Sequence, residues 1–204
     1  MKIFWFDTET TGLRAWHHEA HQVAWAIEVD GYIKETGNVF IRPERWENVD
    51  ERALAVSGTT VEVLKDERHV SPFVAHHMIE EALGRHVDKF DRADKLYPAG
   101  YNCRFDYDFL QDIFERAGDR YFGSWFNHKT IDPLAILRVM DLEGAVGLRG
   151  YKLSDACAAY GIEFDAHDAL GDVLACRQLY HEIVKRQDGL VVLTPPPRRE
   201  GAAT

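Results

Sequence analysis

The chain of 204 residues has few cysteines and no long apolar run. Its three cysteines are an odd number and form no C-x-x-C pair, so we expect reduced thiols. At this length about 70% of the unfolded surface can be buried, so folding needs neither disulfides nor structural zinc. No apolar stretch approaches the roughly 20 residues that span a bilayer, and the first residues lead into a predicted strand, not a signal peptide. We therefore expect a cytoplasmic protein without a membrane partner.

Basic residues are also in deficit, with 24 Lys and Arg against 34 Asp and Glu and a formal net charge of −10. This deficit counts against a protein that grips the nucleic-acid backbone with a basic face. It does not exclude a site where carboxylates hold divalent cations and the cations meet the phosphate. The net charge therefore leaves a nucleic-acid partner open, and the motifs must decide.

The order of predicted elements favours a single α/β domain. Residues 3–6 form a short apolar run typical of a buried strand, and the Asp30-Gly31 pair between two apolar runs predicts a hairpin. Further strands are expected at residues 96–101 and 129–132, and helix-period patterns follow them. Strands first, then helices alternating with strands, predict a mixed sheet with helices on its faces. We expect the domain to cover residues 1–188 and a flexible Pro-rich tail to cover 189–204.

Two carboxylates stand directly after the first predicted strand. Asp7 and Glu9 are two residues apart, so on an extended chain both side chains point to the same face. Two carboxylates placed so would repel each other unless a cation lay between them, and hard oxygen ligands suit Mg²⁺ or Mn²⁺. A lone D-x-E pair is weak evidence, because Asp7 could equally begin a turn and leave Glu9 in solvent.

The D-x-E pair belongs to the first of three segments that follow one another along the chain. These are residues 6–13 (FDTETTGL), 100–110 (GYNCRFDYDFL) and 167–172 (HDALGD). Together they resemble the three exonuclease motifs of the DEDDh 3′→5′ exonucleases, the proofreading, DnaQ-like group. The H-x-A-x-x-D spacing of the third segment separates this branch from its tyrosine-bearing relatives. The resemblance covers about residues 2–186 and implies a ribonuclease H-like fold with a mixed five-stranded sheet flanked by helices.

The resemblance also implies an activity and a set of site residues. It implies a metal-dependent exonuclease that hydrolyses phosphodiester bonds at single-stranded 3′ ends, with DNA as the expected substrate, and releases nucleoside 5′-monophosphates. Two Mg²⁺ or Mn²⁺ ions, roughly 3.5–4 Å apart, would be held by Asp7, Glu9, Asp106 and Asp172. His167 would be the general base, a role that suits its unperturbed pKa of ~6.5. The implied substrate-binding residues are Thr10, Gly12, Leu13, Asn102, Phe105 and His167.

Helix geometry places a condition on the third segment. His167 and Asp172 are five residues apart, which on a regular helix sets them about 140° apart. They reach one site only if His167 lies at or before the helix start, for which Asp165 is a candidate N-cap. Asp168, four residues before Asp172, shares its helix face and is a rival ligand. By contrast, His76 and His77 occupy adjacent positions on a predicted helix, so we expect their side chains to face apart.

Other functions stay open at this point. One is an exoribonuclease that trims RNA 3′ ends, and another is a non-catalytic, polymerase-accessory module that binds nucleic acid. Ser57-Gly58-Thr59 stands where many members of the family have His-Gly-Ile, so the preference for DNA or RNA stays open as well. Phe105 is either a core residue or a substrate contact. A DNA polymerase is a candidate partner, and the chain is either a monomer or a homodimer.

Overall fold

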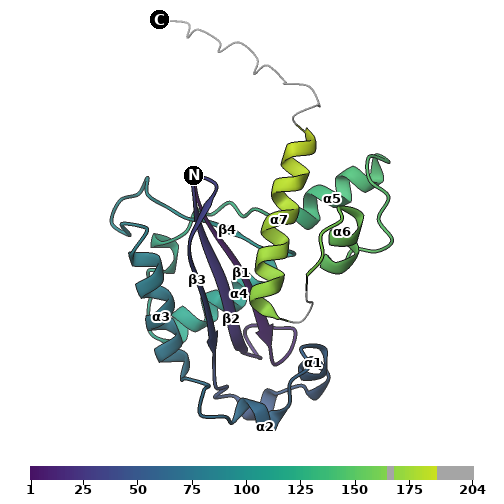
Figure 1. Ribbon diagram of the computed structural model, residues 1–204. Helices are drawn as coiled ribbons and strands as arrows, with labels where there is room; N and C mark the ends of the chain where they lie inside the picture. Colours follow the sequence, from purple (N-terminus) through teal and green to yellow (C-terminus); the bar gives the residue numbers. More distant parts are fainter. Residues whose placement is uncertain (165–167, 188–204) are drawn as a thin grey trace, which may run out of the picture.

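The computed structural model describes residues 1–164 and 168–187, which form a mixed sheet with helices on both faces (Figure 1). The strand order is β3-β2-β1-β4, with antiparallel pairing among the first three and parallel pairing of β4 with β1. The strands are β1 (Lys2–Thr10), β2 (Ala20–Val29), β3 (Tyr32–Phe40) and β4 (Tyr97–Ala99). The α-helices are α1 (Glu51–Val56), α2 (Val61–Leu64), α3 (Pro72–Gly84), α4 (Cys103–Arg116), α5 (Pro133–Leu142), α6 (Leu153–Ala159) and α7 (Ala169–Gln187). The predicted α/β class is therefore confirmed.

The sheet has four strands within the described residues, not the five that we expected. The segment 129–132 forms only an isolated parallel bridge, in which Ile131 donates its N–H to the Pro98 carbonyl at 2.8 Å. Pro133 begins α5 one residue after Asp132, whose carboxylate caps that helix through the Leu134 N–H at 3.0 Å. The chain therefore turns into a helix before a strand ladder can extend. The predicted tail, residues 189–204, lies outside the described residues.

Local turn chemistry explains the hairpin between β2 and β3. Asp30 and Gly31 both have positive φ, at 52° and 84°, which is the backbone that a two-residue type I′ turn requires. Glycine tolerates this region freely, and aspartate is one of the few other residues found there. The hairpin predicted from the Asp-Gly pair is thus present.

Alternation along β1 divides the core into two layers. Phe4 and Phe6 pack into the cluster that includes residues of α3 and α4, whereas Ile3 and Trp5 pack on the other face against α7. Helices α5 and α6 pack against α7, farther from the sheet, around Leu137, Cys157, Leu179 and Ile183 (Figure 1). Because β1 carries apolar side chains on both faces, each face of the sheet must be covered by a layer of helices.

A buried carboxylate fastens α7 to the sheet. Glu28 on β2 is only 2% exposed and accepts hydrogen bonds from Arg177 Nε at 2.6 Å and Trp5 Nε1 at 3.1 Å. His181 Nε2 lies 3.1 Å from the same oxygen. Burial acts to raise the pKa of Glu28, but the bond to His181 and the charge of Arg177 outweigh it and hold that pKa below its usual range. The ionised Glu28 therefore fixes the position of α7, and with it that of Asp172.

The turn between β4 and α4 depends on two unusual backbone positions. A Cβ at Gly100 would lie 2.8 Å from the Phe6 carbonyl oxygen, so only glycine lets this turn approach β1 so closely. Asn102, the residue before α4, has φ 62° and ψ 40°, a left-handed conformation that asparagine tolerates. This tight turn places the first turn of α4 beside the end of β1.

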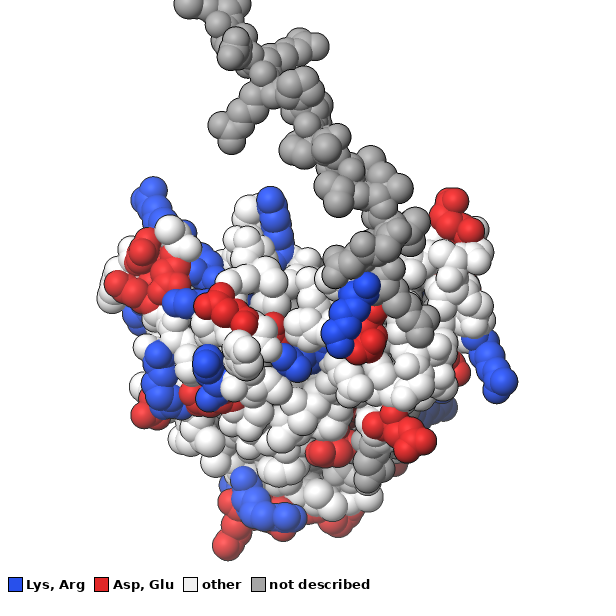
Figure 2. Space-filling model, turned by 45° about the horizontal axis from the view of Figure 1, so that its top comes forward, with Lys and Arg blue, Asp and Glu red and all other residues white. Residues whose placement is uncertain are grey.

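Charges of both signs are interspersed on the face of the molecule drawn in Figure 2, where Lys and Arg side chains lie among Asp and Glu. None of the helices in residues 1–164 and 168–187 combines the length and hydrophobicity that a bilayer crossing needs.

Candidate active site

Three of the predicted ligands come together at the end of β1. Asp7 and Glu9 continue the face of β1 that carries Ile3 and Trp5, which is the face covered by α7. Asp172 lies in the first turn of α7. Single carboxylate oxygens of Asp7, Glu9 and Asp172 all lie within 4.8 Å of one another. Asp172 lies more than 160 positions from Asp7 and Glu9 in the sequence, so only the packing of α7 on the sheet unites the three.

The fourth predicted ligand approaches from the opposite layer. Asp106 lies in the first turn of α4 and is 4% exposed. Thr8, whose side chain points to the α4 side of β1, donates to Asp106 Oδ1 from its backbone N–H at 3.0 Å and from its hydroxyl at 2.7 Å. The helix N-terminus adds a partial positive charge that favours an ionised carboxylate there. Asp106 is therefore held in a defined orientation, close enough to Asp7 for its charge to act on that carboxylate.

Burial and mutual repulsion raise the pKa values of these carboxyl groups. Burial raises the pKa of Asp7 well above its ordinary value, and the charges of Asp106, Glu9 and Asp172 raise it further. Burial, and then the charge of Asp172, raise the pKa of Glu9 to about 7. Burial raises the pKa of Asp106 to about 7 against the lowering effect of the two hydrogen bonds from Thr8. Full ionisation of this cluster is unfavourable without a compensating positive charge.

The composition of the cluster fits a hard divalent cation. All of its donors are carboxylate oxygens, the ligands that Mg²⁺ and Mn²⁺ prefer. A bound cation would also remove the repulsion that raises the carboxyl pKa values, because its charge favours the ionised forms. The residues present therefore suit a divalent metal centre.

The predicted general base cannot be placed. His167 and the predicted cap Asp165 lie outside the described residues. Asp168 directly precedes α7; its carboxylate accepts the Gly171 N–H at 3.2 Å and its carbonyl accepts the Asp172 N–H at 2.9 Å. Asp168 is exposed and lies outside the three-carboxylate cluster, so the structure places the two rival acidic residues in different positions.

Two of the predicted substrate-binding residues, Thr10 and Gly12, make contacts within the chain segment that ends β1 and begins the next loop. Thr10 is 9% exposed and donates from its hydroxyl to the Gly12 carbonyl at 2.8 Å. A Cβ on Gly12 would lie 2.0 Å from Cδ2 of the His18 ring, so a larger residue would displace that ring. Thr10 and Gly12 therefore shape the loop, and only their main-chain groups are available to contact a ligand.

Leu13 and Phe105 line one cavity. Leu13 is 78% exposed, and Phe105 is half-buried against Phe109 with ring centroids 5.0 Å apart. The cavity of about 470 Å³ lies between the loop after β1 and α4, and Trp16 and Arg104 also line it. Phe105 thus packs against the core and also lines this cavity.

Asn102 lies elsewhere in the turn. Its backbone N–H donates to Asp132 Oδ1 at 3.1 Å, and its side chain is exposed without a capping bond. A smaller cavity of about 210 Å³ is lined by Asp7 and Asp172 together with Tyr101, Lys152 and Ser154. Lys152 therefore lines the same cavity as two of the carboxylates.

Sequence reasoning missed the role of Thr8. The motif contains it, but its neighbours Asp7 and Glu9 carry the evident chemistry, and Thr8 points to the other face of β1. The strand period could have indicated that Thr8 faces α4, and thus the segment that holds Asp106. The hydrogen bond itself joins residues 98 positions apart and is visible only in the fold.

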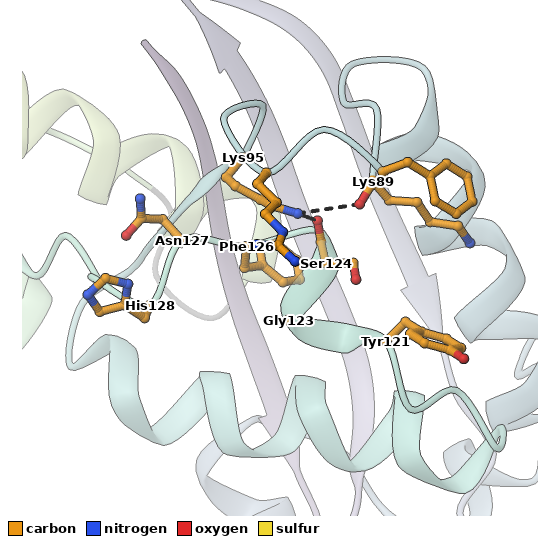
Figure 3. A pocket seen from close by; sticks show the side chains of 10 residues that line it. Lys89, Lys95, Tyr121, Gly123, Ser124, Phe126, Asn127 and His128 are labelled. Carbon is orange, nitrogen blue, oxygen red and sulfur yellow. Dashed lines mark hydrogen bonds between the residues drawn. The ribbon is translucent and has the colours of Figure 1, made fainter.

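A larger cavity is separate from these residues. It measures about 970 Å³ and lies between the segment after α3 and the 3₁₀ turn Phe122–Ser124. Figure 3 shows Lys95 reaching across it toward the main-chain carbonyls of Lys89 and Ser124, to which its ammonium donates. None of the predicted site residues that the structure describes lines this cavity, so its size does not mark the site.

Comparisons with known proteins agree with the geometry. Residues 4–180 match the RNase T family model, described as "Exonuclease". No curated protein matches the chain. Among solved structures, Escherichia coli Exonuclease I in complex with a dT13 oligonucleotide matches with a TM-score of 0.76 and 22% identity over 93% of this chain and 42% of that chain. The zinc-bound form of the E. coli Exonuclease I complex with single-stranded DNA gives 0.77 and 21%, over 92% and 41%.

An Exonuclease I structure from a second organism shows a similar fold. A moderately thermophilic Exonuclease I from Methylocaldum szegediense matches with a TM-score of 0.76 and 24% identity, over 92% of this chain and 41% of that chain. At these identities the likeness establishes the fold. The chain spans less than half of the length of these Exonuclease I structures.

Proposed function

Because the chain belongs to the RNase T exonuclease family, we propose that it is a metal-dependent 3′→5′ exonuclease. Its substrate would be the single-stranded 3′ end of DNA, and its products nucleoside 5′-monophosphates. The observation that carries this proposal is the cluster of Asp7, Glu9 and Asp172, whose ligand atoms lie within 4.8 Å of one another. The matched segment, residues 4–180, contains all three of these residues, and the fold brings their carboxylates together.

The four carboxylates would hold the metal ions. Asp7, Glu9 and Asp172 would bind the first Mg²⁺ or Mn²⁺, and Asp7 and Asp106 would support a second. When bound, such ions lower the pKa of a water nucleophile and stabilise the charge on the leaving 3′-oxygen. The zinc-bound Exonuclease I structure supports a divalent cation in this fold. Mg²⁺ and Mn²⁺ are proposed here because every donor is a carboxylate oxygen.

The remaining residues of the site would bind and orient the nucleic acid. Lys152, beside Asp7 and Asp172, offers an ammonium group to a backbone phosphate. Leu13 and Phe105 would contact the terminal nucleotide from the adjoining cavity, with Thr10, Gly12 and Asn102 shaping the backbone around it. His167 would accept a proton from the attacking water, a role proposed from the third motif.

The preference for DNA is supported by the matched structures. Those of E. coli Exonuclease I include complexes with dT13 and dA16 oligonucleotides, and their fold covers 93% of this chain. The polymerase partner, the oligomeric state and the cytoplasmic location remain predictions. So does the division of the chain into a domain at 1–188 and a tail.

The proposal is tested with a 5′-labelled single-stranded DNA oligonucleotide in Mg²⁺ or Mn²⁺. We expect stepwise shortening from the 3′ end, inhibition by a blocked 3′ end and slower cleavage of the matched RNA, since the 2′-hydroxyl distinguishes the two substrates. Asp172→Asn should reduce the rate by at least about 10³-fold, because loss of a metal ligand removes several kcal/mol of transition-state stabilisation.

Asp168→Asn is the matched control. Asp168 is an exposed acidic residue on the same helix, and asparagine retains the helix cap, so this variant should keep near-parental activity. Equal degradation of free and blocked 3′ ends would exclude an exonuclease. Full activity of Asp172→Asn would show that the carboxylate cluster is not the reaction centre, and faster cleavage of RNA would identify the RNA-trimming alternative.

A further inference from the structure

A second group of metal-ligand side chains lies on α3, away from the carboxylate cluster. His76, His77 and Glu80 each offer one ligand atom, and these atoms all lie within 4.8 Å of one another. The rings of the two histidines have centroids 5.7 Å apart, so adjacent positions on this helix do not separate the side chains as the sequence led us to expect. His76 packs edge-on against Phe114, eight residues beyond Asp106 on α4 and so about 12 Å along that helix. The two groups are therefore distinct sites.

The ring of His76 is bonded on one side only. Its Nε2 lies 3.1 Å from Asp119 Oδ2, just beyond the end of α4, and the residue is 6% exposed. Its Nδ1 is buried and has no hydrogen-bond partner among the described residues. When Nε2 carries the proton that Asp119 accepts, Nδ1 retains a lone pair. A metal-binding histidine typically donates its other N–H to a carboxylate in this way, which fixes the ring for the metal.

We propose that His76, His77 and Glu80 bind a transition-metal cation of the Zn²⁺ class, with Asp119 orienting the His76 ring. Two imidazoles and one carboxylate are a donor set typical of zinc, whereas the carboxylate cluster has oxygen donors only. Zinc bonds of about 2.0–2.2 Å place tetrahedral ligand atoms roughly 3.3–3.5 Å apart. Because the ligand atoms lie within 4.8 Å of one another, the site must contract by at most about 1.5 Å, which the exposed His77 and the half-buried Glu80 can accomplish by side-chain rotation.

Lys89 competes with the cation for one ligand. Its Nζ lies 2.9 Å from Glu80 Oε1 in a partly buried ion pair. A metal ion must displace this ammonium from the carboxylate, so Lys89 lowers the affinity of the site. If Glu80 served only as an ion-pair partner, removal of Lys89 would not strengthen metal binding. The Lys89 variant therefore distinguishes a metal site from a simple surface ion pair.

A bound cation would brace one layer of the molecule. It would join two turns of α3 and, through the His76–Asp119 contact, strengthen the packing of α3 against the end of α4. Ligands that bind only the folded state raise its stability by mass action. The expected effect is thus thermal stabilisation by Zn²⁺, independent of exonuclease activity.

The test uses tag-free, full-length protein carrying Asp7→Asn and Glu9→Gln, which disable the carboxylate cluster. Calorimetric titration with Zn²⁺ and visible absorption with Co²⁺ should both detect one site in this background. His77→Ala and Glu80→Gln should each lower the affinity for Zn²⁺ by at least about tenfold, and Asp119→Asn should lower it by about 10–100-fold. Lys89→Met should raise it. His77 is exposed, so its substitution leaves folding intact, which metal-free thermal unfolding verifies.

His128→Ala is the matched control, since His128 is an exposed histidine outside the cluster, and it should bind Zn²⁺ like the parent. Absence of Zn²⁺ binding in the Asp7→Asn, Glu9→Gln background would overturn the proposal. So would an affinity that neither His77→Ala nor Glu80→Gln changes, or one that Lys89→Met does not raise. Exonuclease activity plays no part in these measurements, so the two proposals fail separately.

Discussion

Thr8 links the two halves of the carboxylate site, and its hydroxyl can be removed with little change in shape. The variant Thr8→Val keeps a β-branched side chain at a position that is 6% exposed and retains the backbone N–H bond to Asp106. It loses only the 2.7 Å hydroxyl bond. We expect this loss to weaken metal binding near neutral pH and to leave it unchanged at higher pH.

The size of the effect follows from the pKa of Asp106. A hydrogen bond to a charged group contributes about 1.5–3 kcal/mol, and the lower value applies because the backbone bond to Asp106 remains. At 1.36 kcal/mol per pKa unit this corresponds to a rise of about one unit. In the parent, a pKa of about 7 leaves Asp106 half ionised at neutral pH. In the variant, whose Asp106 pKa would be about one unit higher, only about one-tenth of the group would be ionised. Since a metal binds the ionised carboxylate, the affinity should fall about fivefold near pH 7.

The assay is calorimetric titration with Mn²⁺ at about pH 7 and about pH 9, where the affinities of parent and variant should converge as Asp106 ionises in both. Thr8→Ser, which retains the hydroxyl, is the control and should behave like the parent. A Thr8→Val variant with parental affinity at both pH values would refute the reasoning. An equal loss at both would show that Thr8 acts through packing and not through the ionisation of Asp106.

Three further predictions concern stability and binding. Because the pKa values of Asp7 and Glu9 are raised, the metal-free native state binds more protons than the unfolded chain between about pH 4 and pH 7. Its melting temperature in a chelator should therefore fall as the pH rises from about 5 to 8, with Mn²⁺ stabilising most at the higher pH; a melting temperature independent of pH would contradict this. Glu28→Ala leaves Arg177 without its buried partner and should cost about 3–5 kcal/mol in urea unfolding, and a cost under about 1 kcal/mol would exclude a clamping role. Trp16 is 72% exposed and lines the same cavity as Leu13, so we expect it to stack on a base. In an Asp172→Asn background, Trp16→Ala should weaken oligonucleotide binding, measured by fluorescence anisotropy, by about 1–3 kcal/mol. Trp16→Phe retains an aromatic ring and should not weaken it.

Features with a local cause could be predicted from the sequence. The hairpin at Asp30-Gly31 follows from the backbone preferences of two neighbouring residues. Likewise α3 begins at Pro72, because the Ser71 side chain accepts the Val74 N–H and proline suits the first position of a helix. Asp7 and Glu9 share a face because the period of a strand is two residues. Each of these depends on chemistry within a few positions of the chain.

Features that depend on competition between segments were predicted less well. The segment 129–132 has the composition of a strand, yet α5 begins at Pro133 and leaves only a bridge at Ile131. The start of α7 is capped by Asp168, a residue that the sequence offered as a rival ligand. His76 and His77 were expected to face apart, but long side chains on adjacent positions can still converge at their ends.

By itself, the sequence determined the family, the α/β class and the acidic side chains available for a metal centre, because these reside in residue types and short spacings. The tertiary structure alone decided which groups meet: the contact of Thr8 with Asp106 spans 98 positions and that of Glu28 with Arg177 spans 149. Such contacts depend on how two helices pack on opposite faces of one sheet. No local preference encodes that packing, since it is set by the summed burial of many apolar side chains.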